Sequence, residues 1–335
     1  FYGAACAMVI WALAPVVKSG WARLLAFSFL VYNPLTYEGE VMTRILRQHI
    51  TIPLALMVAA GMIALVLRRR EPWDVKAGWA LGTGLALGLF WNTREEGIWI
   101  MPMIGMVGLA LAVEAGLQGW RALRAVGVLA GIVIVTAWIP TGLISAMNAK
   151  HYGWFGAVEF RASEFKDAYG ALTRVTVGPD LALVPVTTEA RQAIYEVSPA
   201  FAELRPHLEV GGMAAKWMNH DLYPEHGGDY LAGWFIWAFR DAVTAAGHGK
   251  TPQGFIDYCR KLADEVNAAC YDGRIQSTGS RSGFLSRWHP DYGVRLKGEW
   301  RTYLHEALNK QGFETIVPSS DGTDDDIRYF VDLTY

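Results

Sequence analysis

The sequence has few cysteines, and this shortage limits the class of protein. Only 3 of the 335 residues are cysteine, too few for the disulfide framework that holds small secreted domains together. Cys259 and Cys270 stand eleven residues apart on one expected helix. A rise of about 1.5 Å per residue separates them by roughly 16 Å, which is too far for a disulfide bond. We therefore expect packed, unpaired thiols.

The sequence also lacks the motifs of common cofactor-dependent enzymes and metalloenzymes. It has no phosphate-binding P-loop, no dinucleotide-binding glycine pattern and no nucleophile elbow. Its histidines do not follow zinc-ligand spacings. We interpret His220-Asp221 and Glu225-His226 as polar loop residues, and Asp324–Asp326 as an exposed acidic turn rather than a calcium loop. No metal and no cofactor are expected.

Charged residues make up 19% of the chain and are unevenly spread. Up to Asn148, apolar blocks alternate with short charged links that hold 11 Lys and Arg and 7 Asp and Glu. From Ala149 onward the composition is that of a globular domain, with a net charge of −6. A nucleic-acid-binding protein would carry a basic face, so no nucleic-acid partner is expected.

Long apolar blocks fill the first half of the chain, which is 52% hydrophobic overall. A helix crosses a bilayer with about 20 apolar residues, or fewer where charged ends reach the interface. The second block is the shortest, and a re-entrant segment is the alternative there. The predicted spans are Tyr2–Val17, Trp21–Tyr32, Ile50–Leu67, Ala77–Trp91, Gly97–Leu117 and Ala125–Met147.

These patterns predict a mainly α-helical protein, with a polytopic membrane domain at residues 1–148 and a mostly helical extracytoplasmic domain at residues 149–335. Phe1 already lies in an apolar block, so we expect the chain to be an excerpt of a longer protein. The apolar run 231–239 is too short to span a membrane and is interpreted as a core helix, with an interfacial helix as the alternative. Capping residues and helical periodicity predict helices from Thr187 or Thr188 to Val197, from Ser198-Pro199, over Asp229–Ala246 and over Thr251–Tyr271.

Lys and Arg residues are concentrated in alternate links between the predicted spans. The links at Lys18–Arg23, Arg68–Lys76 and Arg121–Arg124 hold eight of them, whereas the links at residues 33–49 and 92–96 hold three. Basic links face the cytoplasm in most membrane proteins. The asymmetry therefore predicts that the two less basic links and the second domain share the outer side of the membrane.

The first outer link is expected to form a turn followed by a short amphipathic helix. Arg44 and Arg47 stand three residues apart, so their side chains project from one side of such a helix. Two guanidinium groups suit a lipid phosphate, because each offers paired donors to phosphate oxygens. The structural alternative is an ordinary ion pair between Glu40 and Arg44.

The second outer link places Arg94, Glu95 and Glu96 between two apolar blocks. Charges at a membrane boundary are costly to keep unless they bind or catalyse something. Desolvation and a neighbouring arginine act on a carboxylate in opposite directions, so the two glutamates can differ in protonation. We interpret Glu95 and Glu96 as candidate catalytic groups and Arg94, Arg44 and Arg47 as candidate substrate-binding groups. A cluster that only stabilises a helix end is the alternative.

Several segments resemble a known family. Asn33-Pro34 precedes the arginine-bearing outer link, and T-R-E-E-G-I-W-I-M-P opens the following span. The second domain contains V-S-P-A-F-A-E-L-R-P-H-L-E and G-W-F-I-W-A-F-R-D-A-V. On these segments most of the chain resembles bacterial polytopic glycosyltransferases of the GT-C type, in the protein O-mannosyltransferase-like group. The motifs are typical of the family rather than diagnostic of one activity.

The resemblance implies sugar transfer at the outer face of the bacterial inner membrane, from a polyprenyl-phosphate sugar to an unknown acceptor. An acidic residue would activate the acceptor hydroxyl while the lipid phosphate leaves. Members of this family usually hold the principal acid in an earlier outer loop, which would precede Phe1. The main alternative is a non-catalytic envelope protein that presents an extracytoplasmic domain. A transporter ranks third, because few polar residues fall within the spans.

Overall fold

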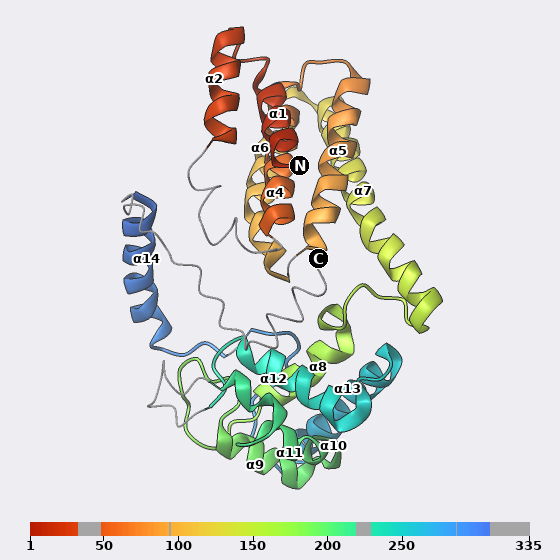
Figure 1. The fold of residues 1–335 in the computed structure, drawn as a ribbon, viewed down its shortest axis with the longest axis vertical. Coiled ribbons are helices and arrows are strands. Elements are labelled where there is room, and N and C mark those ends of the chain that lie inside the picture. The colour runs from red at the N-terminus through yellow and green to blue at the C-terminus, as the bar shows by residue number, and fades with distance from the viewer. Residues whose placement is uncertain (33–47, 94, 219–228, 286, 309–335) are drawn as a thin grey trace, which may run out of the picture. The chain divides into compact units, whose positions relative to one another are not determined.

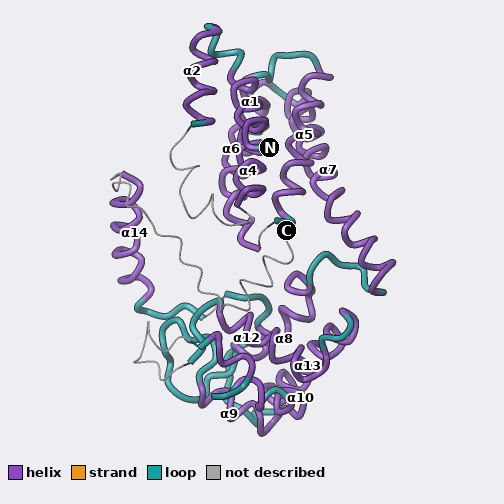
Figure 2. Tube along the Cα trace, viewed as in Figure 1, coloured by secondary structure: helices purple, strands orange, loops and turns teal. Residues whose placement is uncertain are grey.

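The described part of the chain consists of helices and loops (Figure 2). It is a computed structural model. Helix makes up 74% of the structure and no strand forms among the described residues, where Val175 and Ser277 make an isolated antiparallel bridge. The prediction of a mainly α-helical protein is confirmed. The structure describes residues 1–32, 48–93, 95–218, 229–285 and 287–308.

Contacts divide the chain into two compact units, one formed by Phe1–Leu143 and the other beginning at Ile144. The last helix of the first unit continues into the second. The helices of the first unit, labelled in Figure 1, are α1 Tyr2–Leu13, α2 Gly20–Val31, α4 Gln48–Leu67, α5 Trp73–Trp91, η2 Glu95–Ile100, α6 Met101–Gln118 and α7 Trp120–Tyr152.

Three helical segments are long and apolar enough to cross a membrane, namely His49–Leu67, Gly97–Gln118 and Trp120–Tyr152. This finding is consistent with a membrane protein. The apolar helices α1 and α2 have 12 residues each, or about 18 Å, which is short of the roughly 30 Å hydrocarbon core. α5 has 19 residues but begins with Asp74 and Lys76 and is rich in glycine. Three of the six predicted spans therefore meet the requirements of length and composition.

Glycines let α5 approach its neighbours closely. A Cβ added to Gly84 would lie 1.9 Å from Thr136 Oγ1 and 2.4 Å from Val133 O of α7. One added to Gly88, a turn further along, would lie 2.3 Å from the carbonyl oxygen of Ala137. Two small residues four apart are the usual means by which membrane helices pack backbone to backbone. The α5–α7 contact therefore depends on these two glycines.

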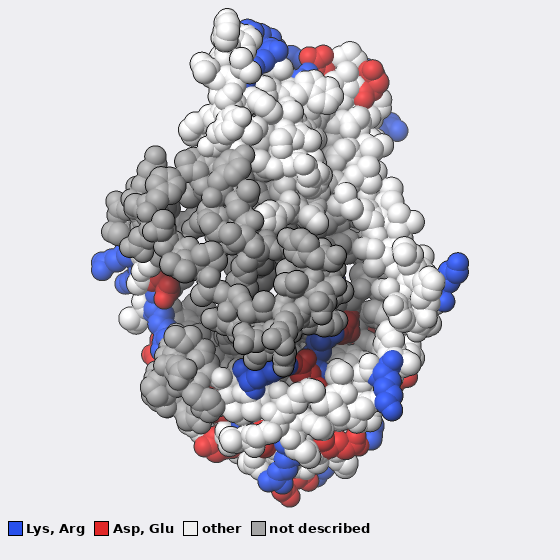
Figure 3. All heavy atoms as spheres, viewed as in Figure 1, with Lys and Arg blue, Asp and Glu red and all other residues white. Residues whose placement is uncertain are grey.

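The three basic links lie at one end of the first unit. Arg23 donates hydrogen bonds to the carbonyl oxygen of Ala14, which caps α1, at 3.1 Å, and to that of Val17 in the turn that follows, at 2.7 Å. Arg68 Nη2 reaches Trp11 O, also near the end of α1, at 2.7 Å. The side chains of Arg69 and Glu114 then join the α4–α5 link to α6 at 2.9 Å. Figure 3 shows charged atoms gathered at this end, at the top of the view, above a largely uncharged face.

The second unit is a helical domain built around aromatic side chains. The ring of Phe165 lies 5.4 Å from Phe239, 5.6 Å from Phe255 and 5.7 Å from Phe284, and it is fully buried. The described helices of this unit are η3 Glu159–Arg161, α8 Ser163–Thr173, α9 Thr188–Val197, α10 Pro199–Glu203, α11 Arg205–Leu208, η4 Met213–Trp217, α12 Trp234–Val243, the π-helical turn η6 Thr244–His248, α13 Pro252–Tyr271 and α14 Tyr292–Leu308.

Three helices of this unit start at their predicted caps. The side chains of Thr187, Ser198 and Thr251 each accept a hydrogen bond from the backbone N–H three residues later, at 3.3, 3.0 and 3.1 Å. Such a bond satisfies one of the free donors of the first turn. These starts are confirmed. One face of α13 is buried and includes Phe255, Cys259, Leu262, Val266 and Ala269.

The predicted helix over Asp229–Ala246 was wrong at its start. α12 begins at Trp234 instead, and the carboxylate of Asp229 binds Thr188 and Arg191 rather than capping a helix. The chain then turns through Ala232, whose φ is 41°. The interpretation of the apolar run 231–239 as a core helix is confirmed, since Phe235 and Phe239 are fully buried.

Candidate functional site

Polar side chains join the N-terminal end of α4 to the C-terminal end of α5. The basic link at Arg68 follows the opposite end of α4. Thr51, in the first turn of α4, donates a hydrogen bond from its hydroxyl to Thr93 Oγ1 at 3.1 Å. The Thr93 hydroxyl in turn donates to the carbonyl oxygen of Phe90 at 2.7 Å. Thr51 closely follows the first predicted outer link, and Thr93 lies within the second. The described flanks of both links therefore meet at one end of the first unit.

Asn92 ties the same end of α5 to α7. Its Nδ2 donates to Gly88 O at 2.7 Å and to Thr141 Oγ1 at 2.9 Å. The bond to Gly88 lies within α5, whereas the bond to Thr141 crosses to α7, which Gly88 allows to approach closely. The end of α5 is therefore fixed to α4 through Thr93 and to α7 through Asn92, which makes it a firm base for the residues that follow.

The candidate catalytic residues come directly after this base. The backbones of Glu95 and Glu96 form the first turn of the 3₁₀ helix η2, which runs to Ile100 and leads into α6. The structure describes the backbone of these two residues and not their side chains. Arg94, Arg44 and Arg47 lie outside the described residues.

Two exposed apolar side chains follow the glutamates in η2. Ile98 and Trp99 are 59% and 80% exposed. A tryptophan at a membrane boundary suits the headgroup region, where its ring is partly apolar and its N–H can reach water. Gly97 lies against α5, since a Cβ added to it would be 3.4 Å from the ring of Phe90 and 3.7 Å from the ring of Trp91. The turn thus combines an inner face held by α5 with an outer apolar face.

Besides the imidazole of His49, in the first turn of α4, the polar groups described at this end are hydroxyls and an amide. The hydroxyls of Thr51, Thr93 and Thr141 and the amide of Asn92 can orient a polar substrate, but they do not accept a proton at neutral pH. A reaction that removes a proton from an acceptor would need a carboxylate or imidazole beside them. Glu95 and Glu96 are the nearest carboxylates in sequence to Thr93.

The second unit contains a buried ion network that the sequence patterns did not reveal. Arg191 is 1% exposed and contacts Asp229 Oδ1 at 2.8 Å and Glu209 Oε1 at 3.1 Å. Its Nη2 also donates to Thr188 Oγ1 at 3.0 Å, and the hydroxyl of Tyr195 donates to Glu209 at 2.8 Å. These residues join α9 to the segments that follow α11 and precede α12.

The network is electrostatically satisfied. Burial alone would lower the pKa of Arg191, but hydrogen bonds and charge from Glu209 and Asp229 raise it by more, so that the net shift is upward. Its guanidinium makes five hydrogen bonds, which match its five donors. The aromatic ring of Tyr230 lies 5.2 Å from the guanidinium carbon. A cation with every donor occupied stabilises the fold rather than binding a substrate.

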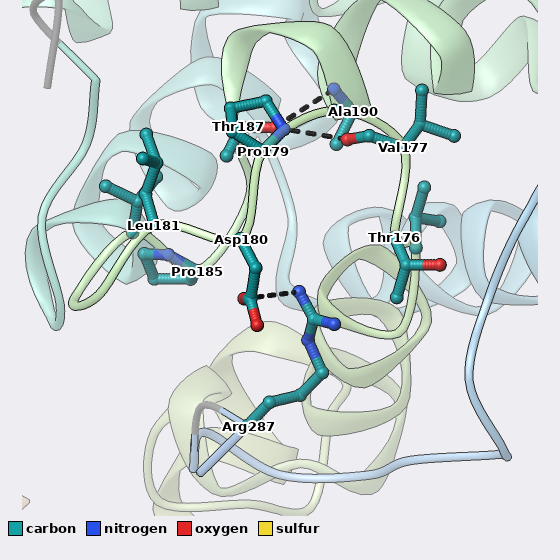
Figure 4. A pocket seen from close by; sticks show the side chains of 12 residues that line it. Thr176, Val177, Pro179, Asp180, Leu181, Pro185, Thr187, Ala190 and Arg287 are labelled. Atoms are coloured by element: carbon teal, nitrogen blue, oxygen red, sulfur yellow. Dashed lines mark hydrogen bonds and ion pairs between the residues drawn. The ribbon is translucent and has the colours of Figure 1, made fainter. Parts of the chain in front are cut away.

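A small cavity lies nearby in the second unit (Figure 4). It has a volume of about 100 Å³, and Arg287 reaches across it to Asp180 Oδ1 at 3.2 Å. Sites for small molecules usually enclose roughly 300–1,000 Å³. This cavity therefore has room for a few water molecules but not for a sugar or a nucleotide.

The three cysteines form no disulfide, and the thiol of Cys259 is unreactive. Cys6 and Cys259 are buried and Cys270 is partly buried, and all three are unpaired as predicted. Burial raises the pKa of Cys259 well above its ordinary value, which keeps the thiol protonated and unreactive. Among the residues that the structure describes, no group of three His, Cys, Asp or Glu side chains is placed to hold a metal ion.

Comparisons with known proteins leave the family open. No protein-family model, curated protein or solved structure matches the chain.

Proposed function

We propose that the protein is a membrane glycosyltransferase that moves a sugar from a polyprenyl-phosphate donor to an acceptor on the outer face of a bacterial inner membrane. The observation that carries the proposal is the hydrogen bond between Thr51 and Thr93. It joins the flanks of two links that contain the candidate arginines and glutamates. Both flanks lie at the end of α4 remote from the basic link at Arg68.

The charge distribution supports the orientation of this site. Links rich in Lys and Arg favour the cytoplasmic side, and in this unit Arg23 and Arg68 both contact the end of α1 while Arg69 contacts α6. The end that holds Thr51 and Thr93 then faces outward. A lipid-linked sugar in the outer leaflet would meet the protein at this level.

In the proposed reaction the second link removes the proton, and arginines of both links bind the phosphate. Glu95 or Glu96 takes the proton of the acceptor hydroxyl, whose oxygen forms a bond to the anomeric carbon of the sugar. The bond from that carbon to the phosphate oxygen breaks, and the phosphate leaves on its lipid. Arg94, Arg44 and Arg47 stabilise the negative charge that builds up on the phosphate, as guanidinium groups do in other phosphate sites. Asn92 and Thr93 hold the start of the second link in place through their hydrogen bonds to Thr141 and Thr51.

The experiment compares envelope glycans by mass spectrometry in a bacterial strain that lacks the gene. The strain receives the intact gene, the double variant Glu95→Gln/Glu96→Gln, or the control Glu71→Gln. Glu71 is an exposed carboxylate in the basic link at the other end of the unit. We expect the intact gene and the control to restore a missing glycan. The double variant should lower its rate of formation by about 10²–10⁴-fold, the usual contribution of a general base.

Two results would contradict the proposal. Unchanged glycans in the strain that lacks the gene would remove the activity itself. Full restoration by the double variant would instead favour a non-catalytic envelope protein, in which Glu95 and Glu96 only stabilise a helix end. Protein levels in the membrane, measured by immunoblot, separate a loss of activity from a loss of protein.

A further inference from the structure

A large cavity opens between α4, α6 and α7 in the first unit, at the end that holds the basic links. Its volume is about 650 Å³, within the range of ligand sites. Along most of its length it is lined by aliphatic side chains, methionine and glycine, including Met62, Leu111 and Val133. α6 and α7 join directly at Gly119, whose φ of 111° turns the chain sharply, and the cavity lies between the two helices.

One end of the cavity is polar and positively charged. Arg69, Arg70, Lys76, Glu114 and Gln118 line it there. The Arg69–Glu114 pair, at 2.9 Å, is neutral overall. Arg70 is exposed and makes no described hydrogen bond or ion pair. The ammonium group of Lys76 meets only the carbonyl oxygen of Arg69, at 3.5 Å, and the ring of Trp73, at 5.8 Å. Neither Arg70 nor Lys76 is therefore held in an ion pair beside the apolar cavity, and the carboxylates of the same link, Glu71 and Asp74, are exposed and absent from the cavity lining.

The apolar part matches the depth of one membrane leaflet. Ile104 and Ala115 line the cavity near its two ends on α6. Their separation of eleven residues corresponds to about 16 Å along the helix. Half of a hydrocarbon core of roughly 30 Å is about 15 Å. An acyl chain whose headgroup lies at Arg70 and Lys76 would therefore run along the cavity and end near Ile104.

Two of the three helices that form the cavity, α6 and α7, have most of their surface exposed. In the apolar segments of α6 and α7, 6% of residues are buried, against 44% in α4. If no ligand is bound, only bulk lipid can cover the apolar lining of the cavity. A bound phospholipid adds a fixed headgroup contact to that apolar contact.

We infer that this cavity binds an anionic phospholipid, with its phosphate at Arg70 and Lys76 and one acyl chain between α6 and α7. The inference is independent of the proposed sugar transfer, since the groups proposed for that reaction lie beyond the other end of α4. Basic pockets between membrane helices on the cytoplasmic side suit anionic headgroups in this way. The bound lipid would hold α6 and α7 at a fixed separation.

Native mass spectrometry of the full chain, released from nanodiscs of equal parts phosphatidylglycerol and phosphatidylcholine, tests the site. We expect one retained phosphatidylglycerol per chain in preference to phosphatidylcholine. The double variant Arg70→Gln/Lys76→Gln should weaken this binding by about 5- to 30-fold, since each cation near an anionic lipid contributes roughly a fivefold factor. Lys18→Gln/Arg124→Gln removes the same charge from the same end without touching the cavity lining and should leave the preference intact.

A second pair of variants tests the apolar part. Gly108 lines the cavity and Gly105 does not, and both have open space where a side chain would begin. Gly108→Phe should fill the cavity and abolish the retained lipid, whereas Gly105→Phe should not. Equal retention of the two lipids, or equal behaviour within either pair of variants, would overturn the inference. Crosslinking of Gly108→Cys to a protein segment instead of lipid would also overturn it, because a helix would then occupy the cavity.

Discussion

Removal of the buried guanidinium of Arg191 should destabilise the second unit more than any surface substitution. Arg191→Leu leaves the carboxylates of Asp229 and Glu209 without their cation, and the first of these side chains is only 6% exposed. Breaking a buried pair by removing one partner costs about 3–5 kcal/mol. For a unit of this size, 1 kcal/mol corresponds to roughly 2–4 °C in the unfolding temperature. The midpoint should therefore fall by about 6–20 °C.

The matched control is Arg205→Leu on the neighbouring short helix α11. Arg205 is exposed and its Nη2 donates to Gln192 Oε1 at 2.7 Å, so its loss should cost at most about 1 kcal/mol. The assay is differential scanning fluorimetry of the purified full chain in mild detergent, with near-ultraviolet circular dichroism to follow the aromatic core. Arg191→Lys should recover part of the loss, because it keeps the charge but not the paired donors. Equal midpoints for Arg191→Leu and Arg205→Leu would refute the reasoning.

Three further predictions concern packing, acid stability and the candidate site. Gly84→Ala should destabilise the α5–α7 contact by about 1–3 kcal/mol through overpacking, whereas Gly82→Ala, which meets open space, should be neutral or stabilising in the same thermal assay. Burial alone would raise the pKa of Asp241, but the indole N–H of Trp217 and the neighbouring lysine lower it by more. The ionised carboxylate therefore stabilises the fold above its ordinary pKa of 3.8, and this stabilisation is lost as the pH falls through the lower pKa of the folded state. The unfolding midpoints of wild type and Asp241→Asn, compared from pH 7 to pH 3, should converge at the acid end. A constant difference between the two midpoints would contradict this prediction. Asn92→Ala should cost about 1–3 kcal/mol through the lost bridge between α5 and α7, and unchanged protease sensitivity near Thr93 would argue against it.

Local signals predicted the helix starts of the second unit well. Thr187, Ser198 and Thr251 act on backbone N–H groups three residues away, so the few residues around each cap contain the necessary information. Asp229 shows the limit of this approach. Its carboxylate binds Arg191, which lies 38 residues earlier, and a contact so distant in sequence is not visible to a local pattern; the helix starts at Trp234.

The packing of the first unit was only partly accessible from the sequence. Gly84 and Gly88 form a recognisable small-residue spacing, but the helix against which they pack becomes known only from the close approach of α7. The alternation of basic links predicted that the two outer links share one end, and the described flanks at Thr51 and Thr93 do meet there. The cationic cavity was not predicted, because its lining comes from three helices that are separated in the sequence.

The claim that the two candidate links converge on the outer face can be measured directly with the cysteine pair Thr51→Cys/Thr93→Cys. The hydroxyl oxygens of these residues are 3.1 Å apart, so the two thiols should form a disulfide on mild oxidation. In intact cells, after reduction, a membrane-impermeant maleimide added outside should label Thr93→Cys, while Lys18→Cys in the basic link should stay unlabelled. A pair that fails to crosslink, or labelling of Lys18→Cys but not of Thr93→Cys, would contradict the account.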